Sequence, residues 1–236
     1  MKLTGFAFGI RTVKSFSVED KLGAIIDEIL YSENSEFNEK LFTEVRENHN
    51  TKLLFDPVGL NKFTITPRDY IFEYSIKKDF DKELEKFLTS YINIVTKKVF
   101  KTFSIRNISR FGFLIKAELT EKDLLLKEVT DIIKKHKGVD DSLSLRFNVI
   151  TKKPLKLTKI VTEDYDSEIV TYDKPDAASP LSFSVDFQKY FKPELNIIED
   201  ATQDYETFCK STYSIYKATY LKNEQEFKKQ ASLQST

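Results

Sequence analysis

Apolar and polar residues alternate with a period of two in several short stretches of the chain, a pattern typical of β-strands that bury one face. Residues 4–12 place Phe6, Phe8 and Ile10 on the same side of such a strand, and residues 70–76 alternate in the same way. The same alternation predicts further strands at residues 102–108, 110–119, 143–150, 156–162, 168–172 and 181–187.

Apolar residues recur every three or four positions elsewhere, which predicts amphipathic helices. Ser17 can cap a helix that runs to about residue 30, and Asp79 can cap a second helix that runs to about residue 97. Two more helices are predicted over residues 120–136 and over about 200–229. The last of them would be ~45 Å long at 1.5 Å per residue. Residues 33–50 stay open between helix and loop.

Between residues 70 and 150 the predicted order is strand, helix, strand, strand, helix, strand, as in the ferredoxin-like fold and the RNA-recognition module. We therefore expect an α+β protein with antiparallel sheets, helices packed on one face, this ferredoxin-like order in the middle of the chain, and a long C-terminal helix. An α+β unit over residues 1–153 would hold the strands near 4–12, 70–76, 102–108, 110–119 and 143–150. A second unit over 154–236 would add a β-hairpin and strand, in a second sheet over 156–187, and the long helix. The two units would share a core.

The stretch RFGFLIKAEL, residues 110–119, resembles the strand on which RNA-recognition modules stack bases. If Phe111 and Phe113 were exposed to bases, the buried side of the strand would have to hold charged residues such as Arg110 and Lys116. Burying unpaired charges is costly, so we expect the aromatic side to face the core. This register predicts buried rings at Phe72, Phe111, Phe113 and Phe147.

The same register leaves a candidate anion-binding or partner-binding face on the other side of the sheet. Its members are basic residues of three predicted strands: Arg106, Arg110, Lys116 and Arg146. Three interpretations stay open. The acidic second half of the chain covers this face, or the face binds nucleic acid or another phosphate ligand, or it binds a partner protein.

Charge is balanced overall but unevenly distributed. The chain has 37 basic and 37 acidic residues, which disfavours a protein whose whole surface attracts polyanions. Residues 68–153 carry a net charge of +6, and the rest of the chain carries −6. Most of the acidic excess lies in residues 154–209, with five basic and twelve acidic side chains. This asymmetry is the reason for expecting the second half to neutralise the basic face.

No catalytic, metal-binding or cofactor-binding residue is predicted. Two histidines and a single cysteine cannot form a zinc site of the usual kind, and no phosphate-binding glycine loop or serine-nucleophile motif occurs. Cys209 lies on the apolar stripe of the last helix, where a buried thiol is more common than a reactive one. The acidic turn at residues 163–168 lacks the glycine and the final glutamate of a calcium loop.

Short apolar runs, no signal-peptide pattern and one cysteine predict a cytoplasmic protein that does not enter membranes. The apolar stripe of the long C-terminal helix exceeds what one small sheet can cover, so we expect self-association. The candidate oligomer interface consists of aromatic residues of that stripe: Tyr213, Tyr216, Tyr220 and Phe227.

From about residue 53 onward the layout resembles a sporadically distributed, uncharacterised family of bacterial proteins of about this length. The resemblance rests on YIFEYSI, ISRFGFLIKAEL, LSFSVDF and a terminal helix through Glu226 and Phe227. In such proteins an aliphatic residue and an arginine usually stand around the glycine, where this chain has Phe111 and Phe113. The resemblance implies no activity.

We therefore expect a non-enzymatic protein-interaction component that acts in a homo-oligomer or a larger bacterial assembly. The alternative is a nucleic-acid-binding subunit that uses the basic sheet face. The sequence identifies neither the partner nor the biological process.

Overall fold

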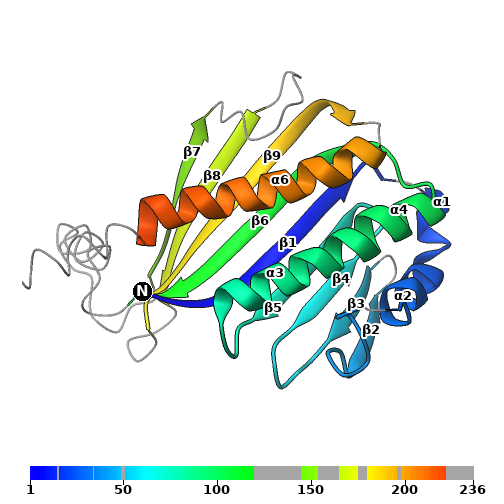
Figure 1. Ribbon diagram of the computed structural model, residues 1–236, viewed down its shortest axis with the longest axis horizontal. Coiled ribbons are helices and arrows are strands. Elements are labelled where there is room, and N and C mark those ends of the chain that lie inside the picture. Colours follow the sequence, from blue (N-terminus) through cyan, green and yellow to red (C-terminus); the bar gives the residue numbers. More distant parts are fainter. Residues whose placement is uncertain are drawn as a thin grey trace, which may run out of the picture.

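A single antiparallel sheet of nine strands forms the centre of the described molecule (Figure 1). The computed structural model describes residues 1–14, 16–33, 35–48, 51–119, 145–153, 165–174, 180–195 and 198–221. The sheet order is β2-β3-β4-β5-β1-β6-β9-β8-β7. The bounds are β1 (Lys2–Thr12), β2 (Glu44–Asn48), β3 (Thr51–Phe55), β4 (Lys62–Ile65), β5 (Asp69–Ser75), β6 (Ile108–Glu118), β7 (Leu145–Lys153), β8 (Tyr165–Lys174) and β9 (Ser182–Leu195). The α+β class is confirmed.

The longer helices lie side by side on one face of the sheet, which we call the helix face (Figure 1). One continuous rod consists of α3 (Phe80–Tyr91), the π-helical η1 (Ile92–Val99) and α4 (Phe100–Thr102). Beside it runs α6 (Ile198–Tyr216), followed by the short π-helical η2 (Lys217–Leu221). The smaller α1 (Phe16–Glu19) and α2 (Leu22–Leu30) complete the described helices. Asp79 caps α3, as predicted, by accepting a hydrogen bond from the Lys82 amide.

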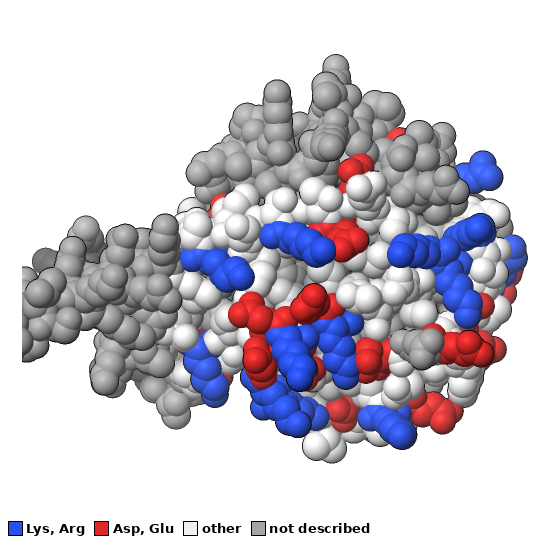
Figure 2. Space-filling model, in the orientation of Figure 1, with Lys and Arg blue, Asp and Glu red and all other residues white. Residues whose placement is uncertain are grey.

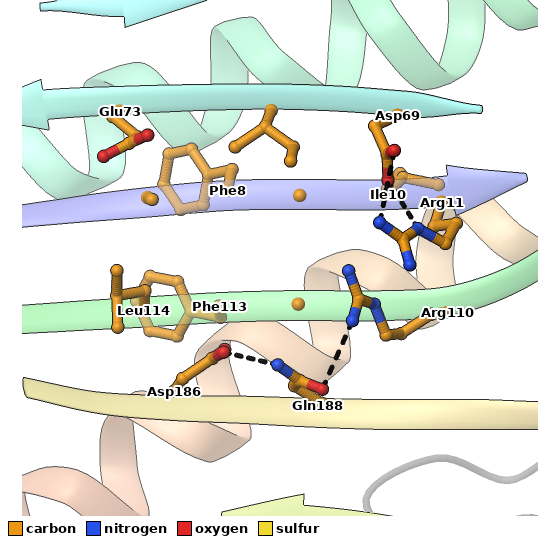
Figure 3. A pocket seen from close by; sticks show the side chains of 14 residues that line it. Phe8, Ile10, Arg11, Asp69, Glu73, Arg110, Phe113, Leu114, Asp186 and Gln188 are labelled. Carbon is orange, nitrogen blue, oxygen red and sulfur yellow. Dashed lines mark hydrogen bonds and ion pairs between the residues drawn. The ribbon is translucent and has the colours of Figure 1, made fainter. Parts of the chain in front are cut away.

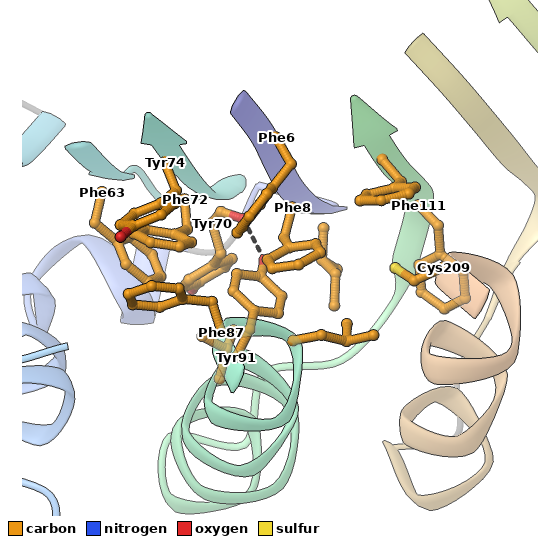
Figure 4. Close-up of a cluster of buried hydrophobic side chains, with 14 of the residues drawn as sticks. Phe6, Phe8, Phe63, Tyr70, Phe72, Tyr74, Phe87, Tyr91, Phe111 and Cys209 are labelled. Carbon is orange, nitrogen blue, oxygen red and sulfur yellow. Dashed lines mark hydrogen bonds between the residues drawn. The ribbon is translucent and has the colours of Figure 1, made fainter. Parts of the chain in front are cut away.

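The core is a layer of aromatic rings between the sheet and these helices (Figure 4). Phe72, Phe111 and Phe113 are at most 1% exposed, which confirms the predicted register and contradicts a base-stacking surface. Phe8 of β1 stacks on Phe113 of β6 with ring centroids 5.5 Å apart. On the helix side, Tyr91 donates a hydrogen bond to the carbonyl of Tyr70. Phe147, also predicted to be buried, belongs to the side chains that the structure does not describe.

Three predictions about the strands are wrong. Residues 103–107 form a turn instead of a strand, since Ser104 and Asn107 have positive φ angles of 53° and 60°. The ferredoxin-like order is not observed in the described residues, because β1 lies between β5 and β6. The second sheet predicted over residues 156–187 does not form in the described residues, because β9 and β8 continue the same sheet beyond β6.

The predicted helix over 120–136 and the predicted strand over 156–162 lie outside the described residues. The proposed division into units at residue 153 is not tested by the described strands and stays a prediction.

Charges of both signs lie side by side over much of the described helix face, and several basic side chains gather toward one end of it (Figure 2). The opposite side of the sheet carries no described helix, and we call it the open face. Alternate residues of each strand point to it, so its composition follows from the polar positions of the alternating strands. These residues form the surface on which the candidate site lies.

Candidate functional site

The open face has a groove of about 160 Å³ over the four central strands β5, β1, β6 and β9 (Figure 3). Gly9 of β1 and Gly112 of β6 lie directly opposite one another and form its floor. Because a glycine has no side chain, two facing glycines leave a depression that neighbouring side chains surround. Strand register places those neighbours in rows across the sheet.

Two arginines form one end of the groove. Arg11 of β1 and Arg110 of β6 lie opposite one another, one row from the glycine pair. Arg11 is held by Asp69 through two hydrogen bonds, 2.6 Å from Nε to Oδ1 and 3.2 Å from Nη2 to Oδ2. These bonds raise the pKa of Arg11, although its partial burial acts in the opposite direction. Arg11 is therefore fixed by a full charge partner.

Arg110 has much weaker partners. Its Nη1 lies 3.4 Å from the Oε1 of Gln188, which is a neutral acceptor near the limit of hydrogen-bond distance. Its guanidinium also lies 5.7 Å from the ring centre of Tyr190. Like Gln188, Tyr190 lies on the open face of β9. Neither contact neutralises the positive charge, so the guanidinium of Arg110 keeps hydrogen-bond donors for a ligand.

Asp186 is an acidic group at the edge of the groove. The Nε2 of Gln188 donates a hydrogen bond to its Oδ2 (Figure 3). Burial raises the pKa of Asp186 to about 6, while the bond from Gln188 and the charge of Arg110 act in the opposite direction. A carboxyl group that is partly buried in a groove, with its pKa raised in this way, is typical of functional sites.

The end of the groove opposite the arginines is apolar. Ala7 and Leu114 lie opposite one another there, and Ile71 borders the glycine floor on β5. Glu73 closes this end, with ion pairs of 2.7 Å to Lys62 and 2.8 Å to Lys116. Burial would raise the pKa of Glu73, but the two lysines lower it below its ordinary value.

A tyrosine reaches the floor of the groove from the helix face. The Tyr205 hydroxyl of α6 accepts a hydrogen bond from the Gly9 amide and donates one to the Gly112 carbonyl, both at 2.9 Å. It therefore bridges β1 and β6 at the glycine pair. Burial raises the pKa of Tyr205 well above its ordinary value, so the hydroxyl stays protonated at neutral pH. This hydroxyl therefore connects helix α6 to the floor of the groove.

The structure does not bring the four residues of the predicted basic face together. Arg110 and Lys116 lie on the open face of β6, but Arg106 is exposed in the turn before that strand. Arg146 is exposed on β7, and β9 and β8 separate it from β6. The prediction of one basic patch of four residues is therefore wrong. It missed Arg11, whose position on β1 follows from the same alternation.

The acidic second half does not cover the open face in the described residues. β8 and β9 continue the sheet sideways, and α6 lies on the helix face (Figure 1). The carboxylates that pair with Arg11 and Lys116 are Asp69 and Glu73, from the first half of the chain. The expected neutralisation is therefore partial, and in the described residues it comes mainly from β5, in the first half of the chain.

The candidate oligomer interface packs largely against the chain's own core. Tyr216 is fully buried, and Tyr220 lies against both Tyr216 and Phe183. Tyr213 stacks on Phe80 of α3 with ring centroids 5.5 Å apart. Phe227 lies outside the described residues. The nine-stranded sheet is wide enough to cover the described part of the apolar stripe of α6 and η2. Uncovered apolar length on this helix is therefore no longer a reason to expect an oligomer interface.

Among the described residues no cluster of three or more His, Cys, Asp or Glu side chains has the arrangement of a metal site. His49, His136 and residues 163–164 of the acidic turn lie outside them. Cys209 is buried on α6, and burial raises the pKa of its thiol far above the ordinary value. No helix in the described ranges is both long and apolar enough to cross a membrane.

No protein-family model matches this chain, and no curated protein sequence matches it. The resemblance to a bacterial family stays a prediction, and the function has to be inferred from the site.

Proposed function

We propose that the protein is a non-enzymatic interaction component of a homo-oligomer or a larger bacterial assembly, and that it contacts its partner through the groove on the open face. The observation that supports this proposal is the composition of the groove. A glycine floor, a weakly paired arginine and a partly buried carboxyl group meet on a sheet face that no described helix covers. Each of these features weakens the isolated fold and becomes useful when a partner fills the groove.

The groove has the character of a binding site more than of a catalytic one. Its described lining contains no Ser, Thr, Cys, His or Lys that could act as a nucleophile. The thiol of Cys209 is buried on the other side of the sheet. We also propose a cytoplasmic location, which a single buried thiol supports.

Photo-crosslinking in the native cells tests this proposal. A photoreactive amino acid at position 71 or 114 would lie in the lining of the groove, whereas one at Lys97 would lie exposed on the helix face. We expect a defined crosslinked protein, either a second copy or another chain, from positions 71 and 114 and none from position 97. Equal crosslinking from all three positions, or crosslinking from position 97 alone, would contradict the proposed surface.

Sedimentation velocity of the purified chain distinguishes the two kinds of partner. In a homo-oligomer the mass at tens of micromolar exceeds the 27.5 kDa of one chain. Leu114→Glu places a charge in the groove and should return the mass to that of a monomer. Lys97→Glu, the matched change on the helix face, should leave it unchanged. A monomeric wild-type protein would assign the crosslink to a different partner chain.

A nucleic-acid-binding subunit is the second candidate, and the facing pair Arg11 and Arg110 is the observation that favours it. The pairing of Arg11 with Asp69 and of Lys116 with Glu73 is against it, because these cations already have charge partners. The aromatic rings of β6 are also buried and are not available for stacking. We therefore rank it below protein binding.

A further inference from the structure

The two glycines of the groove floor are not required by the backbone. Neither has a positive φ angle, and a Cβ atom at either position would be 3.6 Å from its nearest neighbour, which is an ordinary contact. Gly5, on the same strand, is different, because a Cβ there would be 2.7 Å from the carbonyl oxygen of Tyr74. Glycine weakens the interior of a strand. Gly9 and Gly112 therefore lower the stability of their strands, and the backbone does not require them. What they provide is the open space of the groove.

Arg110 is the group that can hold an anion in this space. Among the described residues its guanidinium contacts the neutral Gln188 and the ring of Tyr190 and lies within electrostatic reach of Asp186, while Arg11 is held by two hydrogen bonds to Asp69. The depression over the glycine pair begins one row from both arginines. The planar guanidinium matches the two oxygens of a carboxylate and can bind them with two parallel hydrogen bonds.

The surrounding charges favour a single negative charge on the ligand. Four cationic and three acidic side chains line the groove or pair with its lining, which leaves one positive charge in excess. A monoanion balances this excess. A doubly charged phosphate group or a nucleic-acid backbone would exceed it and would lie close to Asp186.

The apolar side of the groove indicates the chemistry of the part of the ligand that lies beyond its anionic group, which we call its body. Ala7, Leu114 and Ile71 border the floor on the sides away from the arginines. A group that extends from Arg110 across the glycines therefore meets an apolar surface. The volume of about 160 Å³ limits this group to a few carbon atoms.

We infer that the groove binds a carboxylate on a short apolar body, with Arg110 holding the carboxylate and Ala7, Ile71 and Leu114 contacting the body. This inference rests on the proposed function, since the partner would supply the carboxylate, and it specifies the chemistry of that contact. An apolar residue at the C-terminus of a polypeptide carries both parts. A free aliphatic monocarboxylate carries them as well, and the experiment separates these two sources.

Selective [¹⁵N]glycine labelling of the full chain provides the measurement. The sequence contains only six glycines, so the amide spectrum has few signals, and Gly9→Ala and Gly112→Ala each identify one of them by its loss. Sodium butyrate is titrated at constant ionic strength, with butyramide as the uncharged probe of the same shape. We expect the signals of Gly9 and Gly112 to shift with butyrate, with a Kd on the order of 1 mM. Those of Gly23 on α2 and Gly59 should stay in place, and butyramide should shift none.

Two matched variants test the role of Arg110. Arg110→Gln removes the charge at the groove and should weaken butyrate binding at least about tenfold. Lys97→Gln removes one positive charge from the exposed helix face, away from the groove and its ion pairs, and should leave the affinity unchanged. Equal losses in both variants would show a general effect of surface charge and would overturn the inference.

A short peptide with a C-terminal valine, in free-acid and amidated forms, distinguishes the sources. Tighter binding of the free acid than of butyrate supports a polypeptide terminus, and equal or weaker binding supports a free monocarboxylate. An absence of shifts with every carboxylate, or equal shifts with inorganic phosphate, overturns the inference. In that case crosslinking from positions 71 and 114 would still support the proposed interaction surface, so the two failures are distinguishable.

Discussion

At the scale of single residues, Asp186 is the side chain whose position costs the fold most clearly. Burial raises its pKa from 3.8 to about 6, so the folded protein holds the proton more tightly than the unfolded chain. The stabilisation from the protonated form is complete below pH ~4 and is lost as the pH rises to ~6. Above that range the ionised carboxylate costs up to about 3 kcal/mol.

Asp186→Asn should therefore raise the free energy of unfolding by up to about 2 to 3 kcal/mol near pH 8. The amide oxygen can still accept the hydrogen bond from Gln188, and no charge is buried. The gain should vanish near pH 4, as measured by urea denaturation at both pH values. Asp69→Asn is the control and should destabilise near pH 8, because Arg11 loses its partner. Equal stability of Asp186→Asn and wild type near pH 8 would contradict the proposed burial of a charge.

Three glycines on the open face should respond to alanine in two different ways. Gly9→Ala and Gly112→Ala should each raise the free energy of unfolding by about 0.5 to 1 kcal/mol, because the added methyl group meets no clash. Gly5→Ala should lower it, since its Cβ would collide with the carbonyl of Tyr74. Thermal and urea unfolding of the three variants measure this difference. Losses at Gly9 and Gly112 as large as the loss at Gly5 would mean that the fold itself requires these glycines.

Only part of the site could be predicted from the sequence, for a physical reason. Alternation along one strand assigns each side chain to a face, and it correctly placed Arg110 and Lys116 on the open face. It contains no information on which strands are neighbours. The approach of Arg11 and of Gln188 to Arg110 depends on the pairing of β6 with β1 and with β9. Those pairings are long-range and leave no local pattern.

At the scale of elements, α6 is fixed to the sheet by a polar contact as well as by its apolar stripe. Tyr205 packs against Phe111 with ring centroids 4.9 Å apart, and its hydroxyl bridges Gly9 and Gly112. This contact is the only described place where a helix side chain bonds to both backbones of the glycine pair. A change in the spacing of β1 and β6 would therefore strain the two hydrogen bonds of Tyr205 and act directly on α6.

Tyr205→Phe should lower the free energy of unfolding by about 1 to 3 kcal/mol, because a partly buried amide and a partly buried carbonyl lose their partner while the ring still packs. Hydrogen exchange at the Gly9 amide should accelerate in this variant. Tyr213→Phe is the matched change on the same helix, and a smaller loss is expected because that hydroxyl is half-exposed and bonds to the exposed Asp81. Unchanged exchange at Gly9 would contradict the bridging role.

The predicted strands succeeded where one face is buried and failed where this condition does not hold. β1, β5 and β6 alternate because each has one face toward the aromatic core. All five residues of the edge strand β2 are exposed, so no alternation marks it. Residues 103–107 alternate for another reason: Ile105 is buried and Phe103 is partly buried in the turn between α4 and β6. Burial of these two side chains gives residues 103–107 the period-two alternation of a strand, although they form a turn.

At the scale of the whole molecule, many charged side chains of the described residues form local ion pairs instead of extended surfaces of one sign. The net charge is zero. Arg11 pairs with Asp69 and Lys62 with Glu73 on adjacent strands, and Lys116 reaches Glu73 across β1. Such short-range pairing leaves little long-range attraction for a polyanion. The uneven distribution of charge along the sequence therefore does not produce a continuous basic surface on the open face of the described fold.

We accordingly expect no submicromolar binding of single-stranded oligonucleotides at physiological ionic strength. Fluorescence anisotropy over a range of salt concentrations measures this. Any weak binding at low salt should have a small log-log slope, since each phosphate contact on a single strand contributes about −0.7. Tight binding with a steep slope that Arg11→Gln and Arg110→Gln together reduce would favour the nucleic-acid-binding alternative.

The central place of β1 also affects how the chain assembles during synthesis. A ribosome makes β1 before every other described strand, yet its two neighbours are β5 and β6, which begin at Asp69 and Ile108. The nascent chain therefore carries Phe6, Phe8 and Ile10 on a strand with two unpaired edges until β5 emerges, and with one until β6 follows. Exposed apolar strands of this kind attract chaperones and aggregate easily. The middle of the sheet is thus made first and completed only when its flanks arrive.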